Sequence, residues 1–483
     1  MRNLFPGTCA KLPPRWLILR AALAGWLLIA SIPTMAQAEA ESPSRQPFQL
    51  LRYQEDYSYL KDSAGQTAFW DRIKYLPISR SRRAYLSLGG ETRQMFEYYY
   101  NPLWSYEQPG SDGYYLQRYL LHADAHLGSS FRLFAQLGAG IEAGRNEGSR
   151  PVDEDQLFVH QLFTEVTTGE TTRLGLRAGR QEVMLGSGRL VTIREGPNVR
   201  RSFDGVRAFV GTGKQSWSAF VLRPVVNKRG VFDNPVGARG QTLWGLYGVV
   251  PFTLGGYESH LDAYYLGIER RQTVFDQGNG YELRHSVGVR LWQRRAVDYN
   301  LEGVYQWGAF ATGRISAWTL SADVGYTLEN ASVRPRLGLK AELISGDRNP
   351  LDADLQTFNP LFPNGGYFGE AGLVGPANLR NVNPSLDLEI TRKLTGKVDW
   401  DFYWRDQRGD GVYGPTGQLF VPGQGNAARY TGSLSTVEVV YAFNRHLSFN
   451  GIYSHFFRGR FFRENQPQGR EVDFVTAFLT FKF

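Results

Sequence analysis

The chain contains a single cysteine, Cys9, and no apolar run long enough for a transmembrane helix. A helix needs about 20 apolar residues to cross the hydrocarbon core of a bilayer, and the run LAGWLLIASI near the N-terminus is shorter. No stretch has the pattern of a long amphipathic helix. A glycine-rich phosphate loop, a zinc spacing and a nucleophile elbow are also missing in convincing context. These absences leave a chain built mainly from strands.

The first 38 residues have the features of a secretory signal peptide. Four basic residues precede or flank the apolar run: Arg2, Lys11, Arg15 and Arg20. The small residues AQA, ending at Ala38, suit a signal peptidase, so we predict cleavage after Ala38 and export from the cytoplasm. An uncleaved anchor is the alternative, which the short apolar run disfavours. Cys9 precedes the apolar run, which argues against a lipoprotein and leaves the mature chain without cysteine.

The net charge does not point to a nucleic-acid partner. Removal of four basic and no acidic residues with the signal lowers the formal charge from +8 to +4. Aromatic residues make up 14% of the chain and glycines number 54, yet the mean hydropathy is below zero. This mixture suits many strands that face water on one side only.

The C-terminal segment EVDFVTAFLTFKF alternates apolar and polar residues and ends on Phe483. A period of two over about ten residues is typical of the strands of outer-membrane barrels. The segments VDWDFYWRD, VDYNLEGVYQWG and RPRLGLKAEL repeat the alternation. An edge strand of a soluble sandwich is the alternative for one such segment. Because no helix is predicted that would cover so many apolar faces, lipid is the expected cover.

The pattern predicts an all-β fold: a transmembrane antiparallel β-barrel of about eighteen strands, with sixteen as the alternative if boundaries are misplaced. Short turns and long loops alternate, and in bacterial barrels the short turns face the periplasm and the long loops are extracellular. The predicted division is a signal peptide at 1–38, an N-terminal periplasmic or barrel-mouth segment at 39–83, and the barrel at 84–483. We expect strands near 84–97, 115–128, 130–142, 156–168, 172–182, 202–211, 215–224, 241–251, 259–270, 283–293, 297–309, 315–328, 333–345, 385–393, 396–406, 434–443, 446–457 and 473–483.

The window RQEVMLGSGRLVTIREGPNVRRSFDGVR, from Arg180 to Arg207, holds six arginines against three acidic residues. Barrels of sixteen to eighteen strands leave an aqueous channel, and rings of Arg or Lys select anions in pores. An arginine fork also receives a carboxylate in two parallel hydrogen bonds. We expect this segment to fold back into the bore, although a solvated surface loop is the alternative.

The predicted pore-lining residues are Arg177, Arg180, Arg189, Arg194, Arg200, Arg201, Arg207, Arg284, Arg290, Arg336 and Lys340. Of these, Arg189, Arg194, Arg200 and Arg201 are expected to form an anion-attracting constriction. The alternative for each residue is an ion pair with an acid on a neighbouring strand, which would stiffen the wall instead.

The motif RAGRQ at Arg177–Gln181, the following GSGRL and the later RRSFDGVR resemble the signature of the alginate-export family of outer-membrane porins. LSLGGETR, the insert FNPLFPNGGYFGEAGLVGPANL and the last strand are also similar, so the resemblance covers most of the mature chain. The segment GPNVRRSFDG departs from a more acidic loop in the alginate exporter itself. The resemblance implies a monomeric barrel in the outer membrane of a Gram-negative bacterium. It also implies an electropositive channel for an anionic polysaccharide such as alginate or a related uronate.

The expected partners are outer-membrane lipid and lipopolysaccharide, an anionic polysaccharide or a small organic acid, and periplasmic secretion proteins. A diffusion porin for small organic or aromatic acids is the main alternative, and a soluble carbohydrate-binding sandwich is disfavoured by the strand number. For a barrel enzyme, His285 and Ser286 are the only adjacent base and nucleophile on a strand, but neighbours along a strand point to opposite faces. We expect no enzymatic activity and no cofactor.

A calcium site is weakly indicated by GDRNPLDAD, which contains Asp347, Asp352 and Asp354. Carboxylate oxygens suit calcium, but the spacing is not that of an EF-hand. A solvated outer loop is the favoured interpretation, so no metal is expected.

Overall fold

The computed structural model describes residues 46–62, 66, 68–81, 83–104, 110–237, 239–423 and 425–483. The predicted signal peptide and its cleavage site lie outside these residues. The chain divides into two units, Met1–Pro47 and Phe48–Phe483, and the barrel belongs to the second. Within the described residues, no helix has the length and apolar character needed to cross a membrane.

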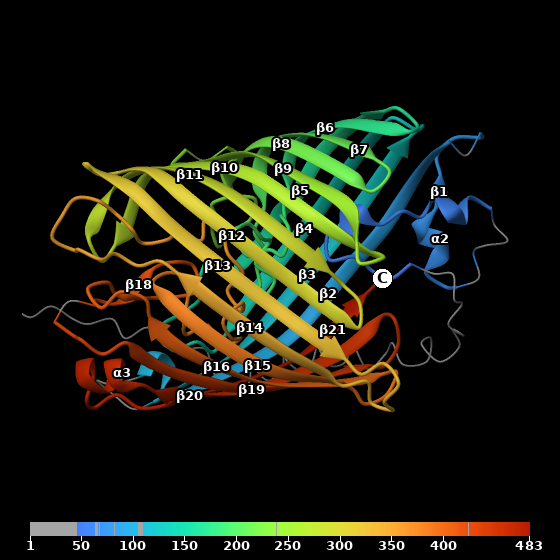
Figure 1. Cartoon of the computed structure of the whole chain (residues 1–483). Helices are drawn as coiled ribbons and strands as arrows, with labels where there is room; N and C mark the ends of the chain where they lie inside the picture. Colours follow the sequence, from blue (N-terminus) through green and yellow to red (C-terminus); the bar gives the residue numbers. More distant parts are fainter. Residues whose placement is uncertain are drawn as a thin grey trace, which may run out of the picture. The chain divides into compact units, whose positions relative to one another are not determined.

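Eighteen antiparallel strands in the described part of the chain close into one barrel (Figure 1). Each strand pairs with the next one along the chain, and the first pairs with the last between Glu91–Lys482 and Tyr100–Asp473. The predicted fold class and strand number are confirmed. The strands are β2 (Ala84–Tyr100), β3 (Ser111–Leu127), β4 (Phe131–Ala143), β5 (Asp155–Thr168), β6 (Thr172–Gln181), β7 (Phe203–Thr212), β8 (Gln215–Pro224), β9 (Gln241–Leu254), β10 (Tyr257–Phe275), β11 (Gly278–Gln293), β12 (Val297–Phe310), β13 (Gly313–Thr327), β14 (Arg336–Ile344), β15 (Leu379–Glu389), β16 (Leu394–Arg405), β19 (Tyr430–Ala442), β20 (Leu447–Arg458) and β21 (Val472–Lys482).

Short elements lie outside the barrel wall proper. Before β2 come two 3-10 turns, Arg52–Gln54 and Ser58–Lys61, the helix α2 (Asp71–Lys74) and the strand β1 (Leu76–Pro77), which pairs with the start of β2. Later in the chain come a 3-10 turn at Pro102–Trp104, a hairpin of β17 (Val412–Tyr413) and β18 (Leu419–Val421), and the helix α3 (Arg460–Asn465).

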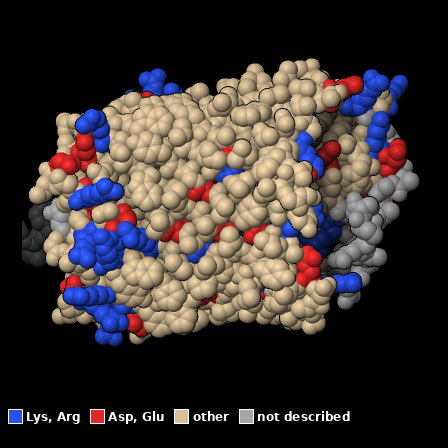
Figure 2. Space-filling model, viewed as in Figure 1, with Lys and Arg blue, Asp and Glu red and all other residues tan. Residues whose placement is uncertain are grey.

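Side chains alternate between the bore and the outer surface, as the sequence pattern predicts. On β14, Leu337 is 57% exposed and Leu339 46%, whereas Glu342 and Ile344 face inward and are buried. Uncharged residues cover most of the visible wall, and Lys and Arg gather mainly towards its two ends (Figure 2). Because strand side chains alternate with period two, one face meets lipid while the other lines the bore.

Connections of two to eight residues lie at one end of the barrel, at 128–130, 169–171, 213–214, 255–256, 294–296, 328–335, 390–393 and 443–446. The opposite end carries the long loops, with two exceptions. A loop was expected between residues 270 and 283, but β10 and β11 continue to a turn of two residues. The strands β12 and β13 join through 311–312, where the predicted strands also left only a short connection. The alternation was obscured because the pairing shifts register between Arg270 and Thr273.

Two long loops fill much of the bore instead of standing outside it. Residues 182–202 and 345–378 place apolar side chains such as Val191, Phe358 and Phe368 in one buried cluster with inward wall residues such as Leu266 and Leu434. The loops also bond to each other, because Thr192 donates its amide to the Phe362 carbonyl and Phe362 donates to Leu190. The bore is therefore narrowed by chain from two distant parts of the sequence.

The topology is tested by two single cysteines introduced into the mature chain. Leu351→Cys lies in a long loop at a position that is 90% exposed, so a membrane-impermeant maleimide should label it on intact cells. Glu170→Cys lies in an exposed short turn and should react only after the outer membrane is permeabilised. Labelling of Glu170→Cys alone on intact cells would show that the barrel is inserted the other way round.

Candidate functional site: an arginine loop in the bore

The loop 182–202, called the arginine loop below, turns sharply after β6. Gly186 and Gly188 have φ angles of 55° and 76°, which a residue with a side chain adopts only at a cost. A Cβ at Gly186 would also lie 2.4 Å from the hydroxyl oxygen of Tyr247 on β9. The glycines of GSG therefore allow the chain to leave the strand and approach the inner face of the wall.

The arginine loop crosses to wall segments far from its own strands. The Arg189 guanidinium donates to the Glu342 carboxylate of β14 at 3.0 Å and lies 3.7 Å from Glu302 of β12. Near the other end of the loop, Asn198 donates its amide to the Gln117 carbonyl of β3 at 2.7 Å. Because these partners lie on different sides of the barrel, the predicted position of the segment in the bore agrees with the structure.

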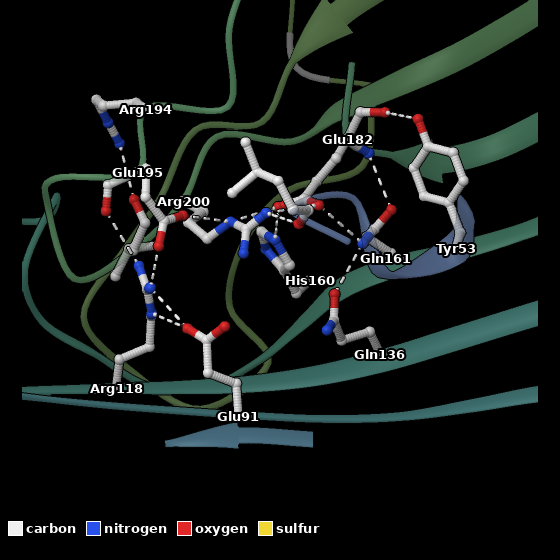
Figure 3. Close-up of polar contacts among 12 residues, drawn as sticks. Tyr53, Glu91, Arg118, Gln136, His160, Gln161, Glu182, Arg194, Glu195 and Arg200 are labelled. Carbon is white, nitrogen blue, oxygen red and sulfur yellow. Dashed lines mark hydrogen bonds and ion pairs between the residues drawn. The ribbon is translucent and has the colours of Figure 1, made fainter. Parts of the chain in front are cut away.

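A network of ion pairs, buried except at Glu195, holds the first residue and the last third of this loop (Figure 3). Arg118 of β3 bonds Glu91 of β2 at 2.6 Å and also pairs with Glu195 of the loop. Arg200 lies 2.8 Å from the Glu182 carboxylate and 3.2 Å from that of Glu195. Burial raises the pKa of Glu195, but Arg118 and Arg200 outweigh it and hold the pKa below its usual value. The Glu195 carboxylate therefore stays charged and offsets the arginines beside it.

His160 and Gln161 of β5 complete the network around Glu182. His160 lies 2.8 Å from one Glu182 oxygen, and Gln161 donates to the other oxygen at 3.2 Å. Glu182 is 1% exposed. A buried charge without its partner costs several kcal/mol. The Glu182 carboxylate is therefore needed to compensate the buried guanidinium of Arg200.

Most of the predicted pore-lining arginines have an acidic partner. Seven of the eleven candidates form such ion pairs in the described part of the chain: Arg177 with Glu165, Arg180 with Asp204, Arg189 with Glu342, Arg200 with Glu182, Arg284 with Glu282, Arg290 with Asp262 and Arg336 with Asp298. For Arg189 and Arg200, the expectation of unpaired charge is wrong. Arg189 meets Glu342 of a strand remote in sequence, whereas Arg200 meets Glu182 and Glu195 of its own loop.

The other four candidates make no ion pair with any described residue. Arg194 donates to the Val199 carbonyl, Arg201 to the Thr192 carbonyl, Arg207 to the Ser218 hydroxyl and Lys340 to the Tyr367 carbonyl. Burial lowers the pKa of Arg194 to about 10. Burial also lowers the pKa of Arg201, and the neighbouring cations Arg194 and Arg270 lower it further. Arginine stays protonated at neutral pH, so positive charge remains here without a carboxylate.

The inner face of β6 and β7 carries a second concentration of positive charge. Arg177 and Arg207 stand directly opposite each other in the strand register, an arrangement that like charges disfavour. Glu165 pairs with Arg177 at 2.5 Å and lies 4.0 Å from Arg173. One carboxylate therefore pairs with two guanidinium groups, and the third, Arg207, has no ion pair with the described residues.

Several residues at this site were not among the predicted ones. Tyr53 of the N-terminal segment donates its hydroxyl to the Glu182 carbonyl, and the Arg177 guanidinium lies 4.1 Å from the centre of its ring. The apolar positions of RYQEDYSYL have no strand periodicity that would have placed them in the bore. His160 and Glu182 were also missed, because their meeting depends on the register of β5 against β6.

The two other sites considered from the sequence are the His285 and Ser286 pair and the aspartate-rich loop that contains Asp347. His285 faces outward against Tyr265 and Trp307, whereas Ser286 faces inward and receives a hydrogen bond from Gln306. Asp347 is buried and accepts backbone amides from Asn349 and Gln356. Among the described residues, no group of three or more His, Cys, Asp or Glu side chains is arranged to hold a metal ion.

The closed barrel, its lipid-facing apolar surface and its charged, loop-narrowed bore define an outer-membrane channel. The chain matches the alginate export family over residues 84–476 and belongs to that family. This confirms the resemblance seen in the sequence and the predicted location in the bacterial outer membrane. A comparison with curated proteins found no match.

Solved structures with the same fold are remote in sequence. Pseudomonas aeruginosa OccK2 (OpdF), solved in complex with glucuronate, is 14% identical with a TM-score of 0.54, covering 85% of this chain and 99% of its own. Pseudomonas aeruginosa OpdK, solved with vanillate, is 12% identical with a TM-score of 0.54, covering 82% and 98%. A BenF-like porin from Pseudomonas fluorescens Pf-5 is 10% identical with a TM-score of 0.55, also covering 82% and 98%. At these identities the similarity shows the fold alone.

The ion-pair network predicts a local effect of Glu182→Gln. The variant leaves Arg200 without its nearest carboxylate, which costs about 3–5 kcal/mol for a buried pair. Amides in 182–202 should therefore exchange hydrogen at least about a hundred-fold faster, while those of the strands keep their protection. Hydrogen exchange followed by mass spectrometry measures both. Glu170→Gln in an exposed turn is the matched control, and equal protection of the loop in both variants would contradict the assigned role.

Proposed function

We propose that this protein is an anion-selective channel for solutes that carry carboxylates, with uronic acids and other small organic acids as the main class. The observation that carries this proposal is the set of inward arginines without a carboxylate partner, Arg194, Arg201 and Arg207, beside the under-compensated Arg177. A water-filled bore with low-dielectric walls concentrates the field of such charges. A carboxylate would find guanidinium donors in the geometry that suits it.

The size of the proposed solute follows from the two loops in the bore. The arginine loop is bonded to the opposite wall through Arg189 and Glu342 and to the loop 345–378 through Thr192 and Phe362. A small acid needs only a gap beside these loops, whereas a polymer needs a continuous wide passage. The structures solved with glucuronate and vanillate, although similar in fold alone, support a solute of this size.

Passage of an anionic polysaccharide such as alginate is the second candidate. Membership of the alginate export family over residues 84–476 favours it. In that case both inner loops must move aside during transport, because their hydrogen bonds cross the path of the polymer. The lipid, lipopolysaccharide and periplasmic secretion partners expected from the sequence belong to this proposal as well.

Ion selectivity in planar bilayers tests the charge assignment. The wild-type channel should prefer chloride over potassium, and more strongly at low salt, because the Debye length grows to about 30 Å at 0.01 M. The variant Arg194→Gln/Arg201→Gln/Arg207→Gln should lower the chloride-to-potassium permeability ratio roughly three-fold at that salt. Arg460→Gln in the exposed part of α3 is the matched control and should leave the ratio unchanged. An unaltered ratio in the triple variant would refute the proposed path.

Solute size is tested with the same channel. Glucuronate should reduce the chloride current and carry current itself, as seen from the reversal potential under a glucuronate gradient. Long oligouronates should reduce the current without a reversal potential of their own. If the oligomers carry current as readily as glucuronate, the channel passes polysaccharide and the second candidate is correct.

A further inference from the structure

Residues 48–57, called the strap below, enter the bore and touch the arginine loop. Leu51 and Tyr53 are buried in one apolar cluster with Phe134 and Phe163 of the wall and Ile193 of the loop. The Tyr53 ring meets the Phe163 ring edge-on at 5.6 Å. Figure 3 shows Tyr53 beside Glu182, with the hydroxyl directed at the Glu182 carbonyl. The strap therefore packs against both the wall and the constriction.

Main-chain carbonyl groups of the strap accept hydrogen bonds from arginines of the bore. Arg200 of the arginine loop donates to the Leu50 carbonyl at 2.8 Å, and Arg132 of β4 donates to the Tyr53 carbonyl at 2.6 Å. The Arg177 guanidinium lies over the Tyr53 ring, 4.1 Å from its centre. The strap thus engages three arginines on the positively charged side of the bore.

The strap is held in the bore by side-chain contacts and not by strand pairing. Among the described residues, its bonds to the wall and the loop all involve a side chain, and none is a backbone pair of the strand ladder. One anchor is Arg52, which donates to the carbonyl groups of Gly90 and Phe483 where β2 meets the end of the chain. Detachment beyond this anchor would break no strand pairing, so the barrel would stay closed.

We propose that the strap is an internal competitor of the transported anion, a proposal that rests on the proposed function. The Leu50 and Tyr53 carbonyl groups share the donors of Arg200 and Arg132 with the resident carboxylates of Glu182 and Asp124. The Tyr53 ring covers the face of Arg177, whose one carboxylate partner among the described residues is Glu165. Hydrogen bonds between a guanidinium and a carboxylate are roughly twice as strong as neutral ones. A carboxylate arriving at the under-compensated Arg177 and at Arg207 opposite it therefore displaces the Tyr53 ring, and the strap swings aside.

The experiment compares Leu51→Ala/Tyr53→Ala with the wild type in planar bilayers. Both changes weaken the packing of the strap and leave every arginine in place. The potassium chloride conductance of a single channel should rise about two-fold or more, because the strap no longer narrows the pore. The glucuronate concentration that halves the chloride current should fall roughly ten-fold, the factor expected when the arginine donors no longer have to be freed.

Ser58→Ala, at an exposed position just after the strap, is the matched control and should behave as the wild type. Heat-modified gel migration verifies that each barrel is folded. Tyr53→Phe keeps the ring and removes only the hydrogen bond to Glu182, so it should raise the conductance in the same direction but less. This variant tests the proposal even if the double variant does not fold.

The outcomes separate the two proposals. Wild-type conductance in Tyr53→Phe and in the folded double variant would overturn the strap proposal, whatever the solute. A raised conductance with unchanged glucuronate block would also overturn competition for the arginines. If the conductance rises and neither variant nor wild type responds to glucuronate, the proposed solute class is wrong, while the strap still narrows the pore.

Discussion

The closed ladder of backbone hydrogen bonds is the constraint on which the rest of the structure depends. In the hydrocarbon core no water is present to satisfy a backbone amide or carbonyl, so a sheet that spans a membrane must pair its edges. Here β2 and β21 close the ring over ten residue pairs, from Glu91–Lys482 to Tyr100–Asp473. Since the wall is complete without the loops, the loops are free to fold inward and determine what passes.

The inward arginines of the bore fall into two groups, those that pair with a carboxylate and those that do not. Carboxylates of the wall pair with arginines: Glu91 of β2 with Arg118, Glu165 of β5 with Arg177, and Glu302 of β12 and Glu342 of β14 with Arg189. The arginine loop itself supplies Glu182 and Glu195, which pair with Arg200. The pairs of Arg189 with Glu342 and of Glu195 with Arg118 fix the arginine loop to the wall, because breaking one leaves a charge uncompensated. In the proposed function, the field that draws an anion comes from the smaller set of arginines without a carboxylate. Paired and unpaired arginines are neighbours in one segment and differ in what lies opposite them.

In the proposal made above, the strap adds a third layer of control over what passes. Wall, loop and strap meet around Tyr53, where aromatic rings, a guanidinium and a main-chain carbonyl replace the water that a wide porin would hold. The contacts of the strap are side-chain contacts and those of the wall are ladder bonds, so the two parts differ greatly in how readily they separate. This difference in bonding is the reason that the strap, and not the wall, is proposed as the displaceable element.

The sequence by itself determined the barrel, its strand number and most strand positions, whereas it left the arginine-rich segment either in the bore or on the surface. Strand alternation is a local property, because lipid and water impose a period of two on every spanning strand. Only the tertiary structure decided which arginines are neutralised, because Glu342 and Glu302 lie more than a hundred residues from Arg189 and reach it through the curvature of the closed wall. The extension of β10 and β11 past the register shift at Arg270, and the placement of Tyr53 in the bore, likewise depend on contacts between distant segments, which no local period records.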